Sequence, residues 1–374
     1  MDQVVISGTG LYTPPCSISN HELIVCFNQY VQSFNHEYAN EIAAGEVVAL
    51  EESSVEFIEK ASGIKSRFVV EKTGILDPER MVPHLPERPD DQPSIMCDMA
   101  VAAAKQALER AGRTAKDVDA VIVAASNMQR AYPAIAVEVQ TALGIDGYGY
   151  DMNVACSSAT FGIQAAVSAI QSGQARAVLV INPEITSGHL NWRDRDSHFI
   201  FGDACTAILL ERADHATSEH QFEIVRVKLK TQFSNNIRNN FGFLNRGDES
   251  GVGKPDKLFR QQGRKVFKEV CPMAAAMITD TVLQSDLKIE DIQRFWLHQA
   301  NLNMNLLIIR QILGRDATST ESPTILDSYA NTSSAGSIIA FHKHQDDLSK
   351  GAHGVICSFG AGYSIGCVVV KKIS

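Results

Sequence analysis

Apolar residues occur along this chain in short unbroken runs that alternate with longer stretches of helical spacing. Unbroken apolar runs of this length are typical of strands buried on both faces of a sheet. Such runs predict strands at residues 4–7, 117–125, 177–182, 201–211, 222–231, 294–298, 354–357 and 365–371. Amphipathic spacing predicts helices at residues 95–111, 133–143, 163–170, 264–284, 303–313 and 332–343. Strands that alternate with helices indicate α/β layers with parallel or mixed sheets.

The order of predicted elements occurs twice, which indicates an internal duplication. We expect a first half over residues 1–212 and a second half over residues 213–374, with residues 221–256 as the connecting region. Two stretches do not follow the alternation. Residues 20–57 are helix-prone and mostly polar, and residues 77–93 contain five prolines among charged residues, which predicts a loop or lid.

Composition narrows the class of protein. The 374 residues carry a net charge of −9, which argues against non-specific binding to nucleic acid. Eight cysteines are scattered without a CxxC pair, so neither a disulfide framework nor a zinc site is indicated. No apolar run is long enough to span a bilayer, and the start lacks the pattern of a signal peptide. We therefore expect a soluble, cytoplasmic protein without a metal site.

The stretch YGYDMNVACSSATFG at residues 148–162 carries the strongest chemical signal. A β-prone segment leads to Cys156, small residues follow at once, and a helical run begins at Ile163. This pattern would place the thiol at a helix N-terminus, where unpaired N–H groups favour a thiolate. The small neighbours would leave room for a substrate at the sulfur. Cys156 is therefore the candidate nucleophile.

Three later segments could assist a nucleophilic thiol, which needs a proton partner and donors for a developing oxyanion. WLHQAN delivers His298 from a predicted strand to a helix start, and ANTSSAGS places Asn331 before a helix rich in small residues. SFGAGYSIG at residues 358–366 could bring backbone N–H groups close to a ligand. Singly, each has a plainer interpretation: a buried turn histidine, a helix-capping asparagine and an ordinary glycine turn. Together, in this order, they are more specific.

With these motifs the chain resembles the β-ketoacyl–acyl carrier protein synthase III group of the thiolase superfamily. The resemblance is carried by NVACSSATFG, HQAN and ANTSSAGS, and by ISGTGLYTP, FIEKASGIKSR, AYPA, RDRDSHFIFGD and FGAGYSIG. NVACSSATFGIQ and RDSHFIFGDACTAIL are most similar to the medium-chain-primed branch, the β-ketodecanoyl synthases. The resemblance implies a duplicated thiolase-like α/β fold, with two αβαβα halves in a five-layered arrangement, and a homodimer.

The resemblance also implies a reaction and its residues. Cys156 would take an acyl group, octanoyl-like in length, from acyl-CoA. Malonyl-acyl carrier protein would then lose CO2 and attack this acyl-enzyme, giving a 3-oxoacyl product in fatty acid synthesis. His298 and Asn331 would hydrogen-bond the malonyl thioester oxygen, and the backbone N–H groups of Cys156 and Ala361 would form the oxyanion hole. Acyl-CoA and the carrier protein are substrates, so no cofactor is expected.

Further contacts carry over from the motifs. Arg195, Asn301 and Phe57 would bind CoA and its pantetheine arm, with Phe57 at a position where the group usually has tryptophan. Tyr132, across the dimer, and Phe359 would border the acyl pocket. Lys268 and Arg310 are candidates for docking the carrier protein. Insertions near residues 28–54 and 75–93 lengthen the chain, and we expect them to cap the acyl-CoA entrance or extend the dimer surface.

Three other functions share parts of this pattern. Papain-like proteases have the same order of Cys, His and Asn, but their cysteine lies near the mature N-terminus in a different motif. Condensation without a carrier protein, as in head-to-head acyl-CoA condensation, usually adds a glutamate near the cysteine; Glu184 is the candidate here, with a surface glutamate as the plainer interpretation. A non-catalytic carrier-binding or chain-length subunit would commonly lack the cysteine.

Overall fold

The computed structural model describes residues 3–249, 254 and 257–374. The predicted connector at residues 221–256 therefore lies partly outside the described residues. The first part of this stretch is a long strand, β8 (Phe222–Ser234), rather than an irregular linker. Within the described residues no helix is both long and apolar enough to cross a membrane.

Nine strands form the main sheet in the order β11-β12-β13-β8-β1-β7-β6-β4-β5. They are β1 (Val4–Tyr12), β4 (Ala120–Ala124), β5 (Tyr148–Met152), β6 (Ala177–Glu184), β7 (Ala204–Arg212), β8 (Phe222–Ser234), β11 (Ile292–Leu297), β12 (His353–Gly360) and β13 (Gly362–Lys372). Two small sheets pair β2 (Cys16–Ser19) with β3 (Ser66–Val69), and β9 (Ile237–Arg238) with β10 (Arg260–Gln261).

The helices are α1 (Asn20–Glu37), α2 (Ala39–Ala43), α3 (Val55–Ser62), α4 (Ile95–Ala111), α5 (Ile135–Leu143), α6 (Ser158–Gln171), α7 (Gly263–Leu283), α8 (Leu302–Leu313), α9 (Leu326–Tyr329) and α10 (Ala335–Lys343). The predicted helix at residues 332–343 begins three residues later than expected, because residues 331–334 form an irregular turn in which Ser333 has a φ of +49°.

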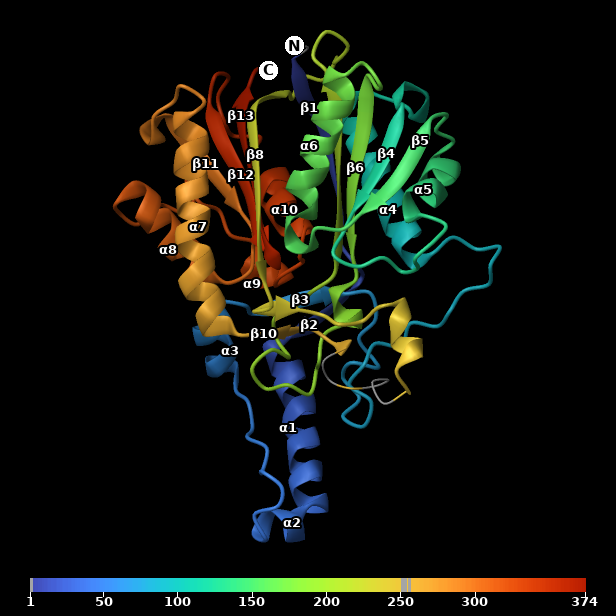
Figure 1. Cartoon of the computed structure of the whole chain (residues 1–374), viewed down its shortest axis with the longest axis vertical. Helices are drawn as coiled ribbons and strands as arrows, with labels where there is room; N and C mark the ends of the chain where they lie inside the picture. The colour runs from blue at the N-terminus through green and yellow to red at the C-terminus, as the bar shows by residue number, and fades with distance from the viewer. Residues whose placement is uncertain (1–2, 250–253, 255–256) are drawn as a thin grey trace.

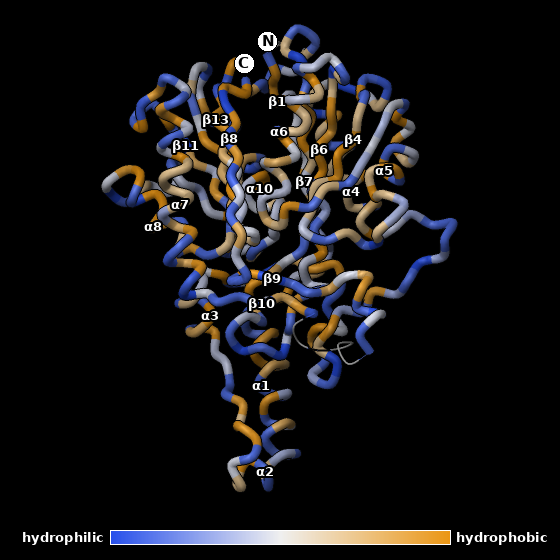
Figure 2. The backbone as a smooth tube through the Cα atoms, in the orientation of Figure 1, coloured by the Kyte–Doolittle hydropathy of each residue, from blue (hydrophilic) through white to orange (hydrophobic). Residues whose placement is uncertain are grey.

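The sheet divides into two halves at β1 and β8, which pair over only two residues each. Figure 1 shows the two half-sheets on either side of α6 and α10, with α4 and α5 outside one and α7 and α8 outside the other. Successive side chains along a strand point to opposite faces of the sheet and pack into two different hydrophobic cores. In β6, for example, Val178 and Val180 pack toward α6 and α10, whereas Leu179 and Ile181 pack toward α4 and α5. The five-layered α/β arrangement is confirmed, and Figure 2 shows the apolar strands at its centre.

The duplication is visible in the strand order. In each half a parallel pair (β4 with β6, β11 with β12) is followed by two antiparallel neighbours (β7 and β1, β13 and β8). In the second half β11 is the edge strand of the sheet, and the N–H of Phe295 donates to the carbonyl of Glu321, in the segment that leads to Asn331, at 2.7 Å. Since α6 follows Cys156 and α10 follows Asn331, these two residues hold equivalent positions in the two halves.

The two insertions lie in different places. Residues 28–54 belong to an arm that projects from the end of the molecule opposite the termini (Figure 1), made of α1, α2 and an extended return segment. Residues 75–93 run without a helix or strand and lead into α4. Neither contributes a lining residue to the pocket that contains Cys156. That these insertions cap the acyl-CoA entrance or extend the dimer surface stays a prediction.

Candidate active site

Cys156 lies in a short 3-10 turn, Ala155–Ser157, between β5 and α6. Ala155 takes a left-handed conformation with a φ of +46°, and the Ser158 hydroxyl accepts from the N–H of Val154 at 2.8 Å. The β12–β13 hairpin of the second half closes on this turn from the other side. A Cβ atom on Gly360 would lie 2.6 Å from the Cβ of Cys156, so the hairpin can approach the cysteine only because this residue is glycine.

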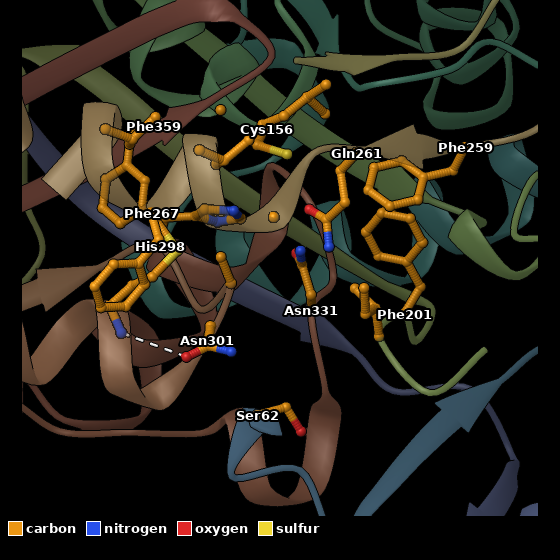
Figure 3. Close-up of a pocket in the computed structure, with 18 of the residues that line it drawn as sticks. Ser62, Cys156, Phe201, Phe259, Gln261, Phe267, His298, Asn301, Asn331 and Phe359 are labelled. Carbon is orange, nitrogen blue, oxygen red and sulfur yellow. Dashed lines mark hydrogen bonds between the residues drawn. The ribbon is translucent and has the colours of Figure 1, made fainter. Parts of the chain in front are cut away.

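The predicted residues of both halves meet at one pocket of about 430 Å³. Cys156, His298, Asn331, Asn301 and Phe359 all line it. Figure 3 shows the sulfur of Cys156, the ring of His298 and the amide of Asn331 directed toward the same space. The pocket is otherwise mostly apolar, with aromatic side chains at both ends: Phe199, Phe201, Phe259, Phe267 and Phe359.

His298 follows the end of β11, and its backbone N–H donates to the carbonyl of Cys357 at 2.8 Å. Burial lowers the pKa of the imidazole to about 4, with an opposing contribution from a hydrogen bond between the ring and the backbone of Ser333. Its Nδ1 atom has no hydrogen-bond partner within the described residues. The ring is therefore neutral at physiological pH, and it can donate one hydrogen bond without carrying charge.

Asn331 is fixed from two sides. Its backbone N–H donates to the carbonyl of Ile200, and its carbonyl accepts from the N–H of Gly202. Its side-chain Oδ1 accepts from the backbone N–H of Ser333 at 2.9 Å, which leaves the amide N–H2 as the group available to a ligand. The plainer interpretation as the cap of α10 is wrong, because Ser334 holds the capping position.

The prediction of a stabilised thiolate is wrong for the protein without substrate. Burial raises the pKa of the Cys156 thiol to about 11, despite the start of α6 nearby. Three hydrogen-bond donors lower the pKa of the thiol. They are the hydroxyl of Ser333, whose Oγ lies 3.4 Å from Sγ, and the backbone N–H groups of Cys156 and Ala361. Loss of hydration outweighs them. Ser333 was missed in the sequence, where its only signal is its place two residues after Asn331.

Glu184, at the end of β6, is not the surface glutamate of the plainer interpretation. It is a buried residue, not a surface glutamate, with 1 % exposure. Its carboxylate accepts from the N–H and hydroxyl of Ser126 and from the N–H and hydroxyl of Ser334. Burial raises its pKa to about 7. The residue thus links the turn after β4 with the turn that carries Ser333, and its negative charge contributes to the high pKa of Cys156.

The residues predicted to contact CoA lie beside the mouth of the pocket. The guanidinium of Arg195 lies 4.3 Å from the centre of the Phe57 ring, and its Nε donates to the carbonyl of Glu52. Neither Arg195 nor Phe57 lines the pocket itself, although their neighbours Asp196 and Ala61 do. Asn301 lines the pocket; its Nδ2 donates to the carbonyl of Ala61 and its Oδ1 caps α8 (Figure 3).

The remaining predicted residues are dispersed. Phe359 packs edge-on against His298, with ring centres 5.3 Å apart. Tyr132 is 85 % exposed and does not line this pocket. Lys268 and Arg310 lie on the neighbouring helices α7 and α8 and are both exposed, but Arg310 is paired with Asp316 at 2.6 Å. Within a single chain, Tyr132, Lys268 and Arg310 therefore lie outside the pocket that contains Cys156.

Known proteins resemble this chain in sequence and in fold. Residues 150–232 match the family described as 3-oxoacyl-[acyl-carrier-protein (ACP)] synthase III, and residues 283–372 match its C-terminal part. A β-ketodecanoyl-[acyl-carrier-protein] synthase from Pseudomonas aeruginosa is 71% identical over 92% of this chain and 99% of its own. A β-ketoacyl-[acyl-carrier-protein] synthase III from Granulibacter bethesdensis is 32% identical over 73% of this chain and 83% of its own.

Solved structures give the same picture of the fold. The priming β-ketosynthase of the R1128 polyketide pathway superposes with a TM-score of 0.78 at 23% identity, covering 99% of this chain and 96% of its own. The 3-oxoacyl-(acyl carrier protein) synthase III of Pseudomonas aeruginosa gives 0.76 at 21% identity, covering 100% and 99%.

The thiolase-like fold, together with the family match and the 71% identical relative, defines a condensing enzyme. This chain belongs to the 3-oxoacyl-[acyl-carrier-protein] synthase III family, and it is an acyltransferase of that type.

Proposed function

We propose that this enzyme condenses a medium-chain acyl-CoA primer with malonyl-acyl carrier protein to give 3-oxoacyl-acyl carrier protein, CO2 and CoA. The observation that carries the proposal is one pocket bordered by Cys156, His298 and Asn331, each held by a different element. The name and 71% identity of the Pseudomonas aeruginosa relative support a medium-chain primer and the carrier protein as acceptor. Such a reaction would feed fatty acid synthesis, and thiol and thioester chemistry require no bound cofactor.

In the first half-reaction the sulfur of Cys156 attacks the acyl-CoA thioester. The cysteine proton leaves with the departing CoA thiolate, so the products are an acyl-cysteine and free CoA. The backbone N–H groups of Cys156 and Ala361, which already act on the sulfur, would donate to the oxyanion of the tetrahedral intermediate. Losing one such donor typically costs about 2.7–4 kcal/mol of transition-state stabilisation.

In the second half-reaction the malonyl thioester enters the same pocket and loses CO2. The neutral imidazole of His298 and the amide N–H2 of Asn331 would donate to the thioester oxygen, which stabilises the enolate. The enolate carbon then attacks the acyl-cysteine and expels the Cys156 sulfur. Because His298 is uncharged, the site would stabilise the enolate without protonating it.

The primer and the carrier protein would approach from the side of α3, α7 and α8. Asn301 would border the pantetheine arm, and Arg195 and Phe57 would bind the nucleotide end of CoA. In direct contact at 4.3 Å, these two side chains leave no space for an adenine ring between them. Arg195 must therefore move before the base can stack on Phe57. Lys268, rather than the paired Arg310, is the better candidate for carrier-protein docking.

A homodimer would complete the assembly along β5. This strand forms one edge of the sheet, and its Tyr148 and Tyr150 side chains are exposed, as are the nearby Tyr132 and Val137. Unpaired edges with exposed aromatic side chains are usually covered in native proteins. A second copy would cover this edge and bring Tyr132 to the acyl pocket of its partner. A molar mass measured by light scattering tests the stoichiometry.

Acyl transfer and decarboxylation are tested separately. Intact-mass analysis after incubation with octanoyl-CoA should show one octanoyl adduct on Cys156. The Cys156→Ser variant should show no octanoyl adduct. His298→Ala and Asn331→Ala should retain adduct formation but lose CO2 release from malonyl-acyl carrier protein by roughly 100-fold or more. Equal loss of both steps in these two variants would contradict the assigned roles.

A further inference from the structure

Ser333 contacts all three residues that the proposed reaction uses. Its hydroxyl Oγ lies 3.4 Å from the sulfur of Cys156, and its backbone N–H donates to the side-chain Oδ1 of Asn331 at 2.9 Å. Its backbone also forms a hydrogen bond with the ring of His298. The backbone of Ser333 therefore contacts His298 and Asn331, whereas its side chain contacts the sulfur.

A serine at this position has no plain structural reason. The φ of Ser333 is +49°, in the left-handed region that glycine adopts without the steric cost of a Cβ atom. The residue is 2 % exposed, so water does not explain the hydroxyl. The N-cap position of α10 belongs to Ser334, and the hydroxyl of Ser333 hydrogen-bonds to Sγ. The contact with the sulfur is the interaction that requires a hydroxyl here.

Three donors act on the sulfur of the free enzyme, but they have different tasks during the reaction. The backbone N–H groups of Cys156 and Ala361 and the hydroxyl of Ser333 all favour the thiolate. Under the proposed function, the two backbone N–H groups donate to the oxyanion on the acyl carbon once the tetrahedral intermediate forms. Of these three donors, the Ser333 hydroxyl is then the one that remains for the sulfur.

The second half-reaction has the greater need for this donor. When the enolate carbon attacks the acyl-cysteine, the bond between the acyl carbon and Sγ breaks, and its electron pair stays on the sulfur. Cys156 is released as a thiolate and then takes a proton from solvent, because CO2 leaves without the negative charge of the malonyl carboxylate. Burial raises the pKa of this thiol to about 11, so the site disfavours the ion that it releases. The neutral ring of His298 brings no positive charge to offset this cost.

Building on the proposed function, we infer that Ser333 is a further catalytic residue, whose hydroxyl donates to the Cys156 sulfur whenever this sulfur carries negative charge. It donates when the sulfur attacks the acyl-CoA thioester, and again when the bond to the acyl carbon breaks. Ser333 keeps its own proton in both steps. Its hydrogen bond therefore lowers both barriers without a change in its protonation state.

Ser333→Ala tests this role, because it removes the hydroxyl and keeps the backbone N–H that holds Asn331. The rate of acyl transfer from octanoyl-CoA to Cys156, followed by rapid quench and intact mass, should fall roughly tenfold, since a hydrogen bond to a charged sulfur is lost. CO2 release from malonyl-acyl carrier protein without a primer should stay within about twofold of the unmodified enzyme, because His298 and Asn331 remain in place.

The products of the complete reaction give a second measurement on Ser333→Ala. An enolate that does not attack the acyl-cysteine takes a proton instead and gives acetyl-acyl carrier protein. If sulfur expulsion is slower, this side reaction gains. The ratio of acetyl-acyl carrier protein to 3-oxodecanoyl-acyl carrier protein should therefore rise roughly tenfold.

Ser333→Gly separates catalysis from folding. Glycine relieves the strain at a φ of +49°, which offsets the greater freedom of the unfolded chain, so the melting temperature should fall by less than about 1 °C. Acyl transfer should nevertheless fall as in Ser333→Ala. Asp286→Gly is the matched control, because Asp286 has a φ of +58° in the turn after α7 and does not line the pocket. It should keep the acyl-transfer rate of the unmodified enzyme.

The outcomes distinguish this inference from the proposed function. If both Ser333 variants transfer octanoyl as fast as the unmodified enzyme and Asp286→Gly, the hydroxyl is not catalytic, although the condensing function stands. If CO2 release falls as far as acyl transfer, Ser333 acts only by holding His298 and Asn331, and the inference is overturned. If the unmodified enzyme forms no acyl adduct on Cys156 with any acyl-CoA, the proposed function itself fails.

Discussion

The sulfur of Cys156 is subject to two opposing effects. Burial and the charge of Glu184 favour the protonated thiol, whereas the Ser333 hydroxyl and two backbone N–H groups favour the thiolate. Under the proposed function, the backbone N–H groups of Cys156 and Ala361 would also stabilise an oxyanion bonded to the acyl carbon. A thiol with a raised pKa reacts slowly with alkylating agents and oxidants near neutral pH.

Two substitutions should change the reactivity of Cys156 in opposite directions. Ser333→Ala removes a donor to the sulfur, which should raise the pKa of the thiol and lower its rate of iodoacetamide alkylation roughly tenfold at a fixed pH. Glu184→Gln removes a buried charge while keeping a similar shape, so the rate should rise. Both rates are measured at about pH 9, where the thiol, with a pKa of about 11, is mostly protonated and the Glu184 carboxyl, with a pKa of about 7, is ionised.

A matched control is Asp203→Asn. Asp203 is also fully buried and accepts from Ser187 and Val70, and its pKa is raised by burial. This variant should keep the alkylation rate of the unmodified enzyme. Shifts of the same sign for Ser333→Ala and Glu184→Gln would mean that Glu184 acts mainly by holding the Ser333 turn, and not by its charge.

At the scale of elements, the buried strands were predictable because alternating helices cover both of their faces. DVDAVIVAA and AVLVIN became β4 and β6 with side chains in two separate cores. The pocket was predictable because Cys156 and His298 each follow a strand, and because Asn331 precedes α10 as Cys156 precedes α6. The burial of Glu184 could not be predicted from the sequence, because it depends on a contact with Ser334 from the other half of the chain. The ring contacts of Phe201 with His189 and Phe259 were also missed, because the turns after β6 and before α7 bring these three residues together.

The arm of residues 28–54 is held by side chains that replace backbone pairing. Asn28 and Asn35, two helical turns apart on α1, each make a reciprocal pair of hydrogen bonds with the backbone of the return segment, at Ser53 and Leu50. An asparagine amide offers one donor and one acceptor, as a peptide group does. The arm is thus a local unit whose order does not depend on the sheet.

Asn35→Ala should loosen the arm alone. Removing both hydrogen bonds to Leu50 should increase amide hydrogen exchange over residues 44–52 by roughly 30-fold, because two bonds of about 1 kcal/mol each are lost. The melting temperature should change by less than about 2 °C, and acyl transfer from octanoyl-CoA should be unchanged. Slower acyl transfer in this variant would show that the arm assists the primer, contrary to its absence from the pocket lining.

At the scale of the whole molecule, several buried histidines make folding sensitive to acid. Burial lowers the pKa of His189, His298 and His342 to about 4 and that of His198 to about 3. Unfolding restores values near 6.5, so the unfolded chain binds more protons and stability falls as the pH drops from 6.5 to 4. Glu184 and Asp203, with raised pKa values of about 7 and 6, oppose this trend, but they are two groups against four.

The melting temperature should therefore fall by roughly 5 °C or more between pH 6.5 and pH 5, since a net uptake of about two protons costs about 3 kcal/mol per pH unit. His198→Phe isolates one contribution. Its ring lies parallel to Phe27 with centres 4.3 Å apart, and neither ring nitrogen has a hydrogen-bond partner among the described residues. A phenylalanine can keep this stacking but binds no proton, so the variant should gain stability most at pH 5 and show a shallower pH dependence in calorimetry. An unchanged slope would mean that His198 stays neutral on unfolding or is protonated in the folded enzyme, and the acid sensitivity would then have to arise from the carboxylates of surface ion pairs.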